Sequence, residues 1–381
     1  MSAPATYPNY SPGLEGVIGG VTTISEIVSD TSSLTYRGYN VHDLASKGSF
    51  EETAYLLLYG KLPNRAELDE LKKTLAEERE VPEAVYAALK QLPADTHPMD
   101  IAKVGFAVAA PYDPDYAAPA TDQAANLRKA VRILAKASTI VGNGHRIRQG
   151  LEPLKPKAEH TIAQNFLYLM SGNEPDAEIA HVFDSSLTLY AEHGFNASTF
   201  ACRVTVATLS DIYSGIVTGI GTLRGPLHGG ANEEAMRMLM EIGTVENAEP
   251  WIRDALATKK KIMGFGHREY KKRDPRAIYL TVVGKELAVK NNVSHFAQIA
   301  DILENVMETE KGIYPNVDFP AAYAYYALGI PIDLYTPIFV VARVSGWSAH
   351  VLEQLSNNRL IRPSVIYEGP HSVEFVPLDQ R

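Results

Sequence analysis

Cysteine is nearly absent from this chain. Its 381 residues include one, Cys202, so no disulfide forms within the chain and a reducing compartment suits it. We expect this thiol to be a small core residue. Residues 1–10 lack the basic and apolar regions of a signal peptide and the arginines of a transit peptide. These features predict a cytoplasmic protein.

The sequence also lacks an apolar run suited to crossing a membrane. The longest apolar stretch, residues 319–344, contains Pro331, Asp333 and Pro337, which a membrane span accommodates poorly. Hydrophobic residues still make up 45% of the chain, enough for a sizeable core. We therefore expect core helices here and either one large domain or two domains.

An excess of positive charge is missing as well. The net charge of −9 argues against general nucleic-acid binding through a basic surface. One short region is an exception, because residues 259–276 concentrate cations around His267: Lys259, Lys260, Lys261, Arg268, Lys271, Lys272, Arg273 and Arg276. Such a cluster in an acidic chain favours a polyanionic small-molecule partner.

Several catalytic and nucleotide-binding motifs are absent. The sequence has no GxxxxGK[S/T], no HExxH and no GxSxG, which excludes the usual P-loop, zincin and α/β-hydrolase sites. Gly219 and Gly221 begin a dinucleotide fingerprint, but Arg224 stands where its third glycine belongs. A helix rather than a strand is also expected before these glycines, so a Rossmann fold is not predicted.

Helix signals dominate what is present. Ser49 and Glu52 form a capping box before a helix over residues 54–59, with Gly60 as its left-handed stop. A second helix begins after Asn64 and repeats leucine at helical spacing. Further helices are expected over residues 82–92, 98–110, 121–141, 159–171, 175–193, 197–219, 232–242, 248–260, 274–290, 295–310, 318–328 and 336–356. Strand-like alternation is confined to residues 16–27 and 364–376, so the fold class is mainly α with minor β structure at the termini.

His228 is the most informative single residue. It lies in the segment GPLHGGANEEA (residues 225–235), just before a predicted helix start. The backbone amides of that helix start direct their positive ends at the ring, which disfavours its protonation. The sequence therefore predicts a neutral imidazole that polarises a carbonyl group by donating a hydrogen bond.

Two further segments follow His228 in a characteristic order. They are GFGHREYK with DPR (residues 264–271 and 274–276) and PNVDF (residues 315–319). Together with His228, they resemble the citrate synthase family, and the resemblance runs from about residue 35 to residue 363. It implies a large helical domain, residues 1–228 and 333–381, into which a smaller helical domain, residues 229–332, is inserted. The chemical motifs would then lie near the seam between the two domains.

The resemblance implies an acyltransferase that condenses acetyl-CoA with oxaloacetate and hydrolyses the citryl thioester to citrate and free CoA. This reaction is the first step of the tricarboxylic acid cycle. Asp318 is the expected base for the acidic α-proton, and His228 the expected donor to the thioester oxygen. His267 is the expected donor to the ketone oxygen of oxaloacetate. The implied cosubstrate is acetyl-CoA, with no tightly bound cofactor and no metal.

A dicarboxylic substrate requires cations that grip planar carboxylates, which arginine does through two parallel hydrogen bonds. By resemblance, the oxaloacetate-binding residues are His193, Arg276, Arg343 and Arg362. Arg362 would reach the active site of the other subunit, so we expect an obligatory homodimer, with higher oligomers left open. Arg359 is a close competitor for that role.

The basic region would supply counter-charge for the phosphates of coenzyme A. Lys271 matches a phosphate-binding cation of the family, with Lys259, Lys261 and Arg268 as helpers. Gly264 and Gly266 would let the backbone approach the adenine closely.

Two alternatives remain open at this stage. A 2-methylcitrate synthase uses the same residues on propionyl-CoA, and no sequence feature excludes it. From a different class, His193, His228, His267 and Asp318 are residue types that would suit a zinc-dependent hydrolase.

Overall fold

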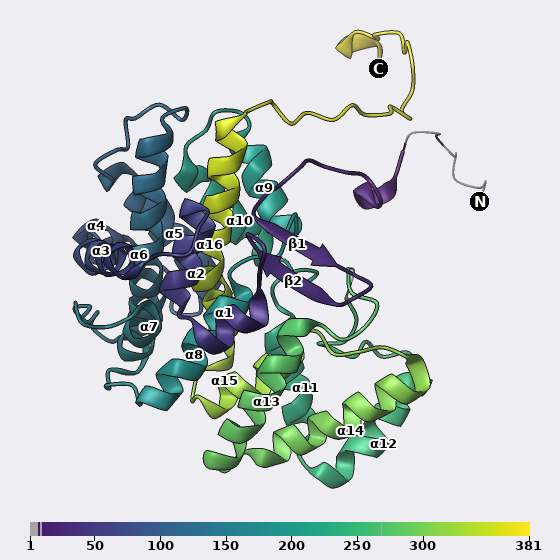
Figure 1. Cartoon of the computed structure of the whole chain (residues 1–381). Helices are drawn as coiled ribbons and strands as arrows, with labels where there is room; N and C mark the ends of the chain where they lie inside the picture. The colour runs from purple at the N-terminus through teal and green to yellow at the C-terminus, as the bar shows by residue number, and fades with distance from the viewer. Residues whose placement is uncertain (1–6, 8–9, 268) are drawn as a thin grey trace.

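The computed structural model describes residues 7, 10–267 and 269–381. In this part of the chain there are sixteen α-helices and a single small antiparallel sheet, which lies at one side of the helical body (Figure 1). The predicted mainly helical fold class is therefore confirmed. No helix among the described residues is both long and apolar enough to cross a membrane.

The helices and strands follow one another along the chain with these bounds. The strands are β1 Ser25–Val28, β2 Ser33–Tyr36 and β3 Tyr39–Asn40. The helices are α1 Val41–Lys47, α2 Phe50–Tyr59, α3 Arg65–Glu78, α4 Glu83–Leu89, α5 Pro98–Ala109, α6 Gln123–Arg148, α7 Ile162–Ser171, α8 Ala177–Tyr190, α9 Ala197–Val206, α10 Ile212–Leu223, α11 Ala231–Ile242, α12 Val245–Ala257, α13 Pro275–Lys290, α14 Ser294–Lys311, α15 Asp318–Ala327 and α16 Tyr335–Ser356.

The predicted helix caps are present. Ser49 and Glu52 form a reciprocal capping box at the start of α2, and Gly60 ends that helix with a φ of 81°. Asn64 caps α3 in the same way. Leu68, Leu71 and Leu75 lie on the buried face of α3, as their spacing predicts.

The prediction of one helix over residues 197–219 is wrong, because the chain breaks between α9 and α10. Leu209 adopts a left-handed φ of 67°, which an α-helix does not accommodate. Asp211 then caps α10 by accepting a hydrogen bond from the amide of Ser214 at 3.1 Å. The break contains neither glycine nor proline, so the sequence gives little warning of it.

The strand predictions are largely wrong. Of residues 16–27, only the last three belong to a strand, β1, and residues 364–376 form no strand. β1 instead pairs with β2, with Ser25 opposite Tyr36, and β2 pairs with β3. The sheet contacts the chain just after α8, because the hydroxyl of Tyr36 at the end of β2 donates to the carbonyl of Glu192 at 2.9 Å.

Helix α16 lies at the centre of the molecule. It contacts α2, α5, α6, α8, α9 and α10, and most of its side chains are buried (Figure 1). Trp347 and Arg343 are among its fully buried residues. Cys202 packs in the same core, as predicted. A buried arginine must be paired or hydrogen-bonded to offset the loss of its hydration.

Helices α11 to α14 form a second group, with α15 packed against α11 and α13 (Figure 1). This group also contacts the rest of the molecule, through α1 and α8 against α13 and through α16 against α11.

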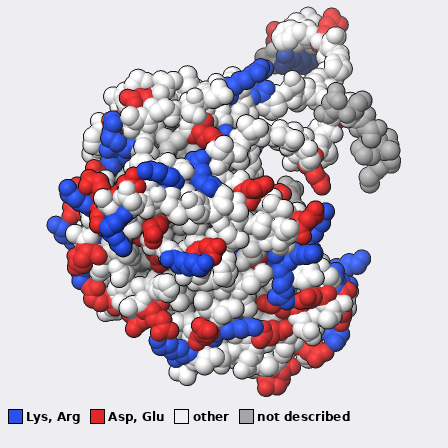
Figure 2. All heavy atoms as spheres, viewed as in Figure 1, with Lys and Arg blue, Asp and Glu red and all other residues white. Residues whose placement is uncertain are grey.

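The C-terminal segment, residues 357–381, leaves the helical body after α16 (Figure 1). It carries exposed apolar residues such as Val365 and Phe375, whose exposed fractions are 89% and 79%. On the face shown in Figure 2, acidic and basic side chains are interspersed rather than separated by sign.

Candidate active site

Two loops that carry predicted catalytic residues are bonded to each other. The amide of Gly266 donates to the carbonyl of Tyr314, and the amide of Asn316 donates to the carbonyl of Gly264, both at 2.9 Å. The side chain of Asn316 donates to the carbonyl of Gly266, also at 2.9 Å. His267 follows one loop and Asp318 follows the other, so this pairing fixes their relative positions.

Gly264 is required by this pairing. Its φ is +79°, and a Cβ atom there would lie 2.8 Å from Cβ of Phe319, the residue after Asp318. Gly266 has the same φ, but its nearest such contact is Ile313 at 3.7 Å. The close approach at Gly264 is thus made to Phe319, and the predicted contact of these glycines with adenine stays a prediction.

His267 is held as a neutral donor. Its Nδ1 accepts hydrogen bonds from the amides of Glu269 at 3.0 Å and Tyr270 at 3.4 Å. An acceptor Nδ1 places the ring proton on Nε2. Burial first, and then the charge of Arg276, lower the pKa of His267 to about 4. At neutral pH the ring therefore donates from Nε2.

His228 is held as a neutral donor of the opposite tautomer. Its Nε2 lies 3.3 Å from the amide of Ser198 and 2.8 Å from the hydroxyl of the same residue. A backbone N–H only donates, so Nε2 is the acceptor and the proton sits on Nδ1. Trp347 orients the hydroxyl of Ser198 by donating to it at 3.1 Å.

The surroundings of His228 also favour the neutral state that the sequence predicts. Helix α11 begins at Ala231, as the sequence predicts within one residue. Burial first, and then the charge of Arg343, lower the pKa of His228 to about 4. Removal from water and the nearby positive charge both disfavour the protonated ring.

Asp318 is the first residue of α15 and is partly buried. The hydroxyl of Tyr190 donates to its Oδ1 at 2.8 Å. Burial raises the pKa of Asp318 to about 6, against the hydrogen bond from Tyr190 and the charge of Arg276, which both lower it. A carboxylate with such a pKa is ionised at neutral pH and yet basic enough to accept a proton.

Arg276 is buried and pairs with Asp274 through two hydrogen bonds, at 3.0 and 2.7 Å. Asp274 also accepts from the amide of Val317 at 3.1 Å, which ties the start of α13 to the Asp318 loop. Burial alone would raise the pKa of Asp274, but the charge and hydrogen bonds of Arg276 hold it below its ordinary value.

Arg343 is the buried arginine of α16. Its Nε donates to the carbonyl of Tyr190 at 2.7 Å, and its guanidinium lies over the ring of Phe339 at 4.6 Å. Its Nη2 is buried and has no hydrogen-bond partner among the described residues. Burial lowers the pKa of Arg343 to about 10, so it is still a cation at neutral pH. A buried cation with an unused donor is a site for an anion.

His193 lies beside His267. Their ring centroids are 5.0 Å apart, and Nε2 of His193 is 3.1 Å from the hydroxyl of Tyr270. Burial, followed by the charges of Arg276 and His267, places the pKa of His193 well below its ordinary value.

The positive charges of Arg276 and Arg343 act on several of these residues at once. The charge of Arg343 lowers the pKa values of His228, His193 and Asp318. The charge of Arg276 does the same for His267, His193 and Asp318. The structure thus brings His193, His228, His267, Asp318, Arg276 and Arg343 around one buried region of positive charge.

The remaining predicted residues lie outside this region. Lys259 and Lys261 are exposed beyond the end of α12, and Lys271 is exposed with its Nζ 3.6 Å from a carboxylate oxygen of Asp30. Arg268 lies outside the described residues. Arg362 and its competitor Arg359 are exposed, on the segment that leaves the body after α16.

Sequence reasoning missed the side chains that hold the catalytic candidates. Tyr190 contacts Asp318, Ser198 contacts His228, and Asp274 contacts Arg276. Asp274 belongs to the DPR motif, and Tyr190 and Ser198 lie three and five residues from His193. Their bonds to His228 and Asp318 span 30 and 128 positions, so no local pattern indicates them.

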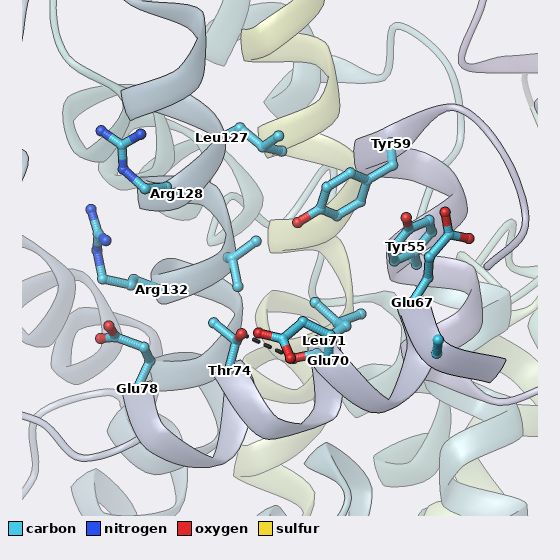
Figure 3. Close-up of a pocket in the computed structure, with 12 residues that line it drawn as sticks. Tyr55, Tyr59, Glu67, Glu70, Leu71, Thr74, Glu78, Leu127, Arg128 and Arg132 are labelled. Carbon is cyan, nitrogen blue, oxygen red and sulfur yellow. Dashed lines mark hydrogen bonds between the residues drawn. The ribbon is translucent and has the colours of Figure 1, made fainter. Parts of the chain in front are cut away.

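A separate cavity of about 640 Å³ lies between α2, α3 and α6 (Figure 3). Tyr59, Leu71 and Leu127 line it, with Glu70 and Glu78 on α3. None of the predicted site residues belongs to these helices, so this cavity is not the candidate site. Among the residues that the structure describes, no group of His, Cys, Asp or Glu is arranged to hold a metal ion.

Comparison with known proteins places this geometry in context. A family model described as "Citrate synthase, C-terminal domain" matches residues 13–364. The chain is 49% identical to "Citrate synthase 2" of Bacillus subtilis, over 97% of this chain and 98% of that protein. It is 45% identical to a citrate synthase of Synechocystis, over 98% and 94% of the two chains. It is also 43% identical to a 2-methylcitrate synthase of Mycobacterium tuberculosis, over 99% and 95%.

Solved structures match the fold as well. A citrate synthase of Pyrobaculum aerophilum superposes with a TM-score of 0.91 at 39% identity, over 97% of this chain and 95% of that one. A citrate synthase of Thermoplasma acidophilum, solved as a ternary complex with carboxymethyl coenzyme A and oxaloacetate, gives a TM-score of 0.92 at 35% identity, over 98% and 99%.

Proposed function

Because the chain belongs to the citrate synthase family, we propose that it condenses acetyl-CoA with oxaloacetate and hydrolyses the product thioester to citrate and free CoA. The family match confirms the expected enzyme class, a transferase, and the structural matches confirm the citrate synthase-like fold. One observation supports the activity most strongly. Two neutral histidines of opposite tautomer and an ionisable carboxylate lie in a buried site with an arginine donor that has no hydrogen-bond partner in the described part of the chain.

In the proposed first step, Asp318 removes a proton from the methyl group of the acetyl thioester. Its Oδ1 is bonded to Tyr190, so Oδ2 is the oxygen we assign to this proton. Nδ1–H of His228 donates to the thioester oxygen as negative charge develops there. Each positioned donor of this kind stabilises the enolate by about 3 kcal/mol.

In the second step, the nucleophilic carbon attacks the ketone carbon of oxaloacetate. The ketone oxygen gains negative charge, and Nε2–H of His267 donates to it. Water then hydrolyses the citryl thioester, which breaks the carbon–sulfur bond and releases the thiol of CoA.

We assign the carboxylates of oxaloacetate to the cationic part of the site. Arg343 offers its unused Nη2, His193 lies against His267, and Arg276 would accept a carboxylate beside its pair with Asp274. Arg362 is assigned to the site of a partner subunit. Its exposure on a segment with bare apolar side chains supports that assignment, because such surfaces mark protein contacts.

Four further assignments extend this proposal. Residues 229–332 form the smaller domain, inserted between residues 1–228 and 333–381, and the chain acts as a homodimer. The exposed Lys259, Lys261 and Lys271, with Arg268, meet the phosphates of CoA, and Gly264 and Gly266 lie near its adenine.

The decisive test is release of free thiol from acetyl-CoA, measured with and without oxaloacetate. Release that requires oxaloacetate and forms citrate supports the proposal. A parallel assay with propionyl-CoA addresses the 2-methylcitrate synthase alternative, and a strong preference for propionyl-CoA would replace acetyl-CoA in the proposal. Activity that is lost on chelation and restored by zinc would instead favour the hydrolase alternative.

A further inference from the structure

We propose that Tyr190 is a positioning residue for the catalytic base: its hydroxyl holds one oxygen of Asp318 so that the other oxygen faces the acyl substrate. The proposal rests on the function proposed above, in which Asp318 removes the methyl proton. It concerns a residue that the sequence motifs do not assign to the reaction.

The contact is direct and buried. The hydroxyl of Tyr190 donates to Oδ1 of Asp318 at 2.8 Å, and Tyr190 is 1% exposed. Burial, and then the charge of Asp318, raise the pKa of Tyr190 well above its ordinary value. The hydroxyl therefore stays protonated and acts only as a donor to the carboxylate. This rules out Tyr190 as a competing base.

The ring of Tyr190 is itself held in place. It packs edge-on against Phe339 with centroids 4.6 Å apart, and it lies 6.5 Å from the ring of Tyr325. Its backbone carbonyl accepts from Nε of Arg343 at 2.7 Å. One residue at the end of α8 thus joins the base to the arginine that we assign to oxaloacetate, and a rigid donor orients its acceptor.

The other charged groups around Asp318 do not replace this contact. Arg276 and Asp274 face it from the start of α13, and Arg343 faces it from α16. The two arginines act on Asp318 through charge, but Arg276 donates its hydrogen bonds to Asp274 and Arg343 donates to the carbonyl of Tyr190. Among the described residues, it is Tyr190 that donates a hydrogen bond to the carboxylate of Asp318, and none of these three groups does so.

The experiment compares Tyr190→Phe with Tyr325→Phe. Each substitution removes one buried hydroxyl and keeps the ring, and the hydroxyl of Tyr325 bonds Ser186 at 3.2 Å rather than Asp318. For each variant, kcat and KM are measured across the acidic and neutral pH range. Oxaloacetate affinity and thermal unfolding are measured alongside.

We expect Tyr190→Phe to lower kcat by roughly tenfold through lost orientation of the base. The acidic limb of its kcat profile should also move upward by about one pH unit, because the lost hydrogen bond favours ionised Asp318. Tyr325→Phe should keep the wild-type limb. A Tyr190→Phe profile that superimposes on the wild type, or that falls uniformly without moving its limb, would overturn the proposal.

A double-mutant cycle with Asp318→Asn separates positioning from general stability. If Tyr190 acts through Asp318, adding Tyr190→Phe to Asp318→Asn should cause no further loss of kcat. An equal loss in both backgrounds would overturn the proposal.

Carboxyl-carbon NMR titration of Asp318 provides a readout that does not need turnover. An upward shift of its titration in Tyr190→Phe supports the contact, and an unchanged titration contradicts it. If the wild-type enzyme releases no thiol, the proposed function fails, while this titration still decides whether Tyr190 controls the carboxylate.

Discussion

Replacing Gly264 with alanine should destabilise the pairing between the Gly264 loop and the Asn316 loop, which precede His267 and Asp318. Gly264 has a φ of +79°, and the added Cβ would lie 2.8 Å from Cβ and 3.0 Å from Cα of Phe319. The left-handed backbone costs an alanine about 1–2 kcal/mol. Forcing an extra carbon against a packed residue costs about 1–3 kcal/mol more.

Gly266→Ala is the matched control for this substitution. Gly266 has the same φ of +79°, but its nearest neighbour for a new Cβ is Ile313 at 3.7 Å, an ordinary contact. Both variants therefore bear the backbone cost, and only Gly264→Ala bears the steric cost. Gly264→Ala should be less stable than Gly266→Ala by about 1–3 kcal/mol.

Urea unfolding followed by circular dichroism measures this difference, taken as the shift of midpoint at a common slope. Phe319 directly follows Asp318, so displacement of Phe319 should also lower kcat in the thiol-release assay. Equal unfolding midpoints for the two variants would refute the steric argument and leave only the shared backbone strain.

Three other predictions follow from the site. Arg343→Lys should raise the KM for oxaloacetate at least tenfold, because lysine lacks the second donor of a planar pair; near-normal kinetics would remove Arg343 from the site. kcat should fall as the pH drops below about 6, because protonation of Asp318 removes the base, whereas His228 and His267 stay neutral down to about pH 4. A fall centred near pH 4 would contradict this assignment. Arg362→Ala should be nearly inactive alone. Mixed dimers of Arg362→Ala and Asp318→Asn subunits should regain thiol release, because each mixed dimer contains one site with both residues intact. If confirmed mixed dimers show no recovery, Arg362 does not act in the partner's site.

Local sequence signals predict most of the helices well, because a few adjacent residues are enough to form a helix cap. Ser49 with Glu52, and Asn64 with Glu67, satisfy the free amides of their own helices. The break at Leu209 contains neither glycine nor proline, and the Asp211 cap that follows it was not predicted. The alternating residues 16–24 are not part of a strand. The strands that do form are β1 and its partner β2, and β2 was not predicted.

The candidate site likewise has some features that the sequence predicts and others that depend on the folded structure. His228, His267 and Asp318 stand in short motifs that the sequence displays directly. The tautomer of His228 and the bond from Tyr190 to Asp318 depend on contacts between distant segments. The same is true of Nη2 of Arg343, which has no hydrogen-bond partner among the described residues. Only the folded chain reveals which nitrogen donates and which oxygen is free.

The pairing of the Gly264 and Asn316 loops means that His267 and Asp318 travel as one body. His228 is anchored elsewhere, to Ser198 at the start of α9. Any rotation that separates α15 from α8 would therefore break the bond from Tyr190 to Asp318 while leaving both histidines with their own partners. Asp318 would then lose the contact that aligns its carboxylate before either histidine loses the contact that fixes its tautomer.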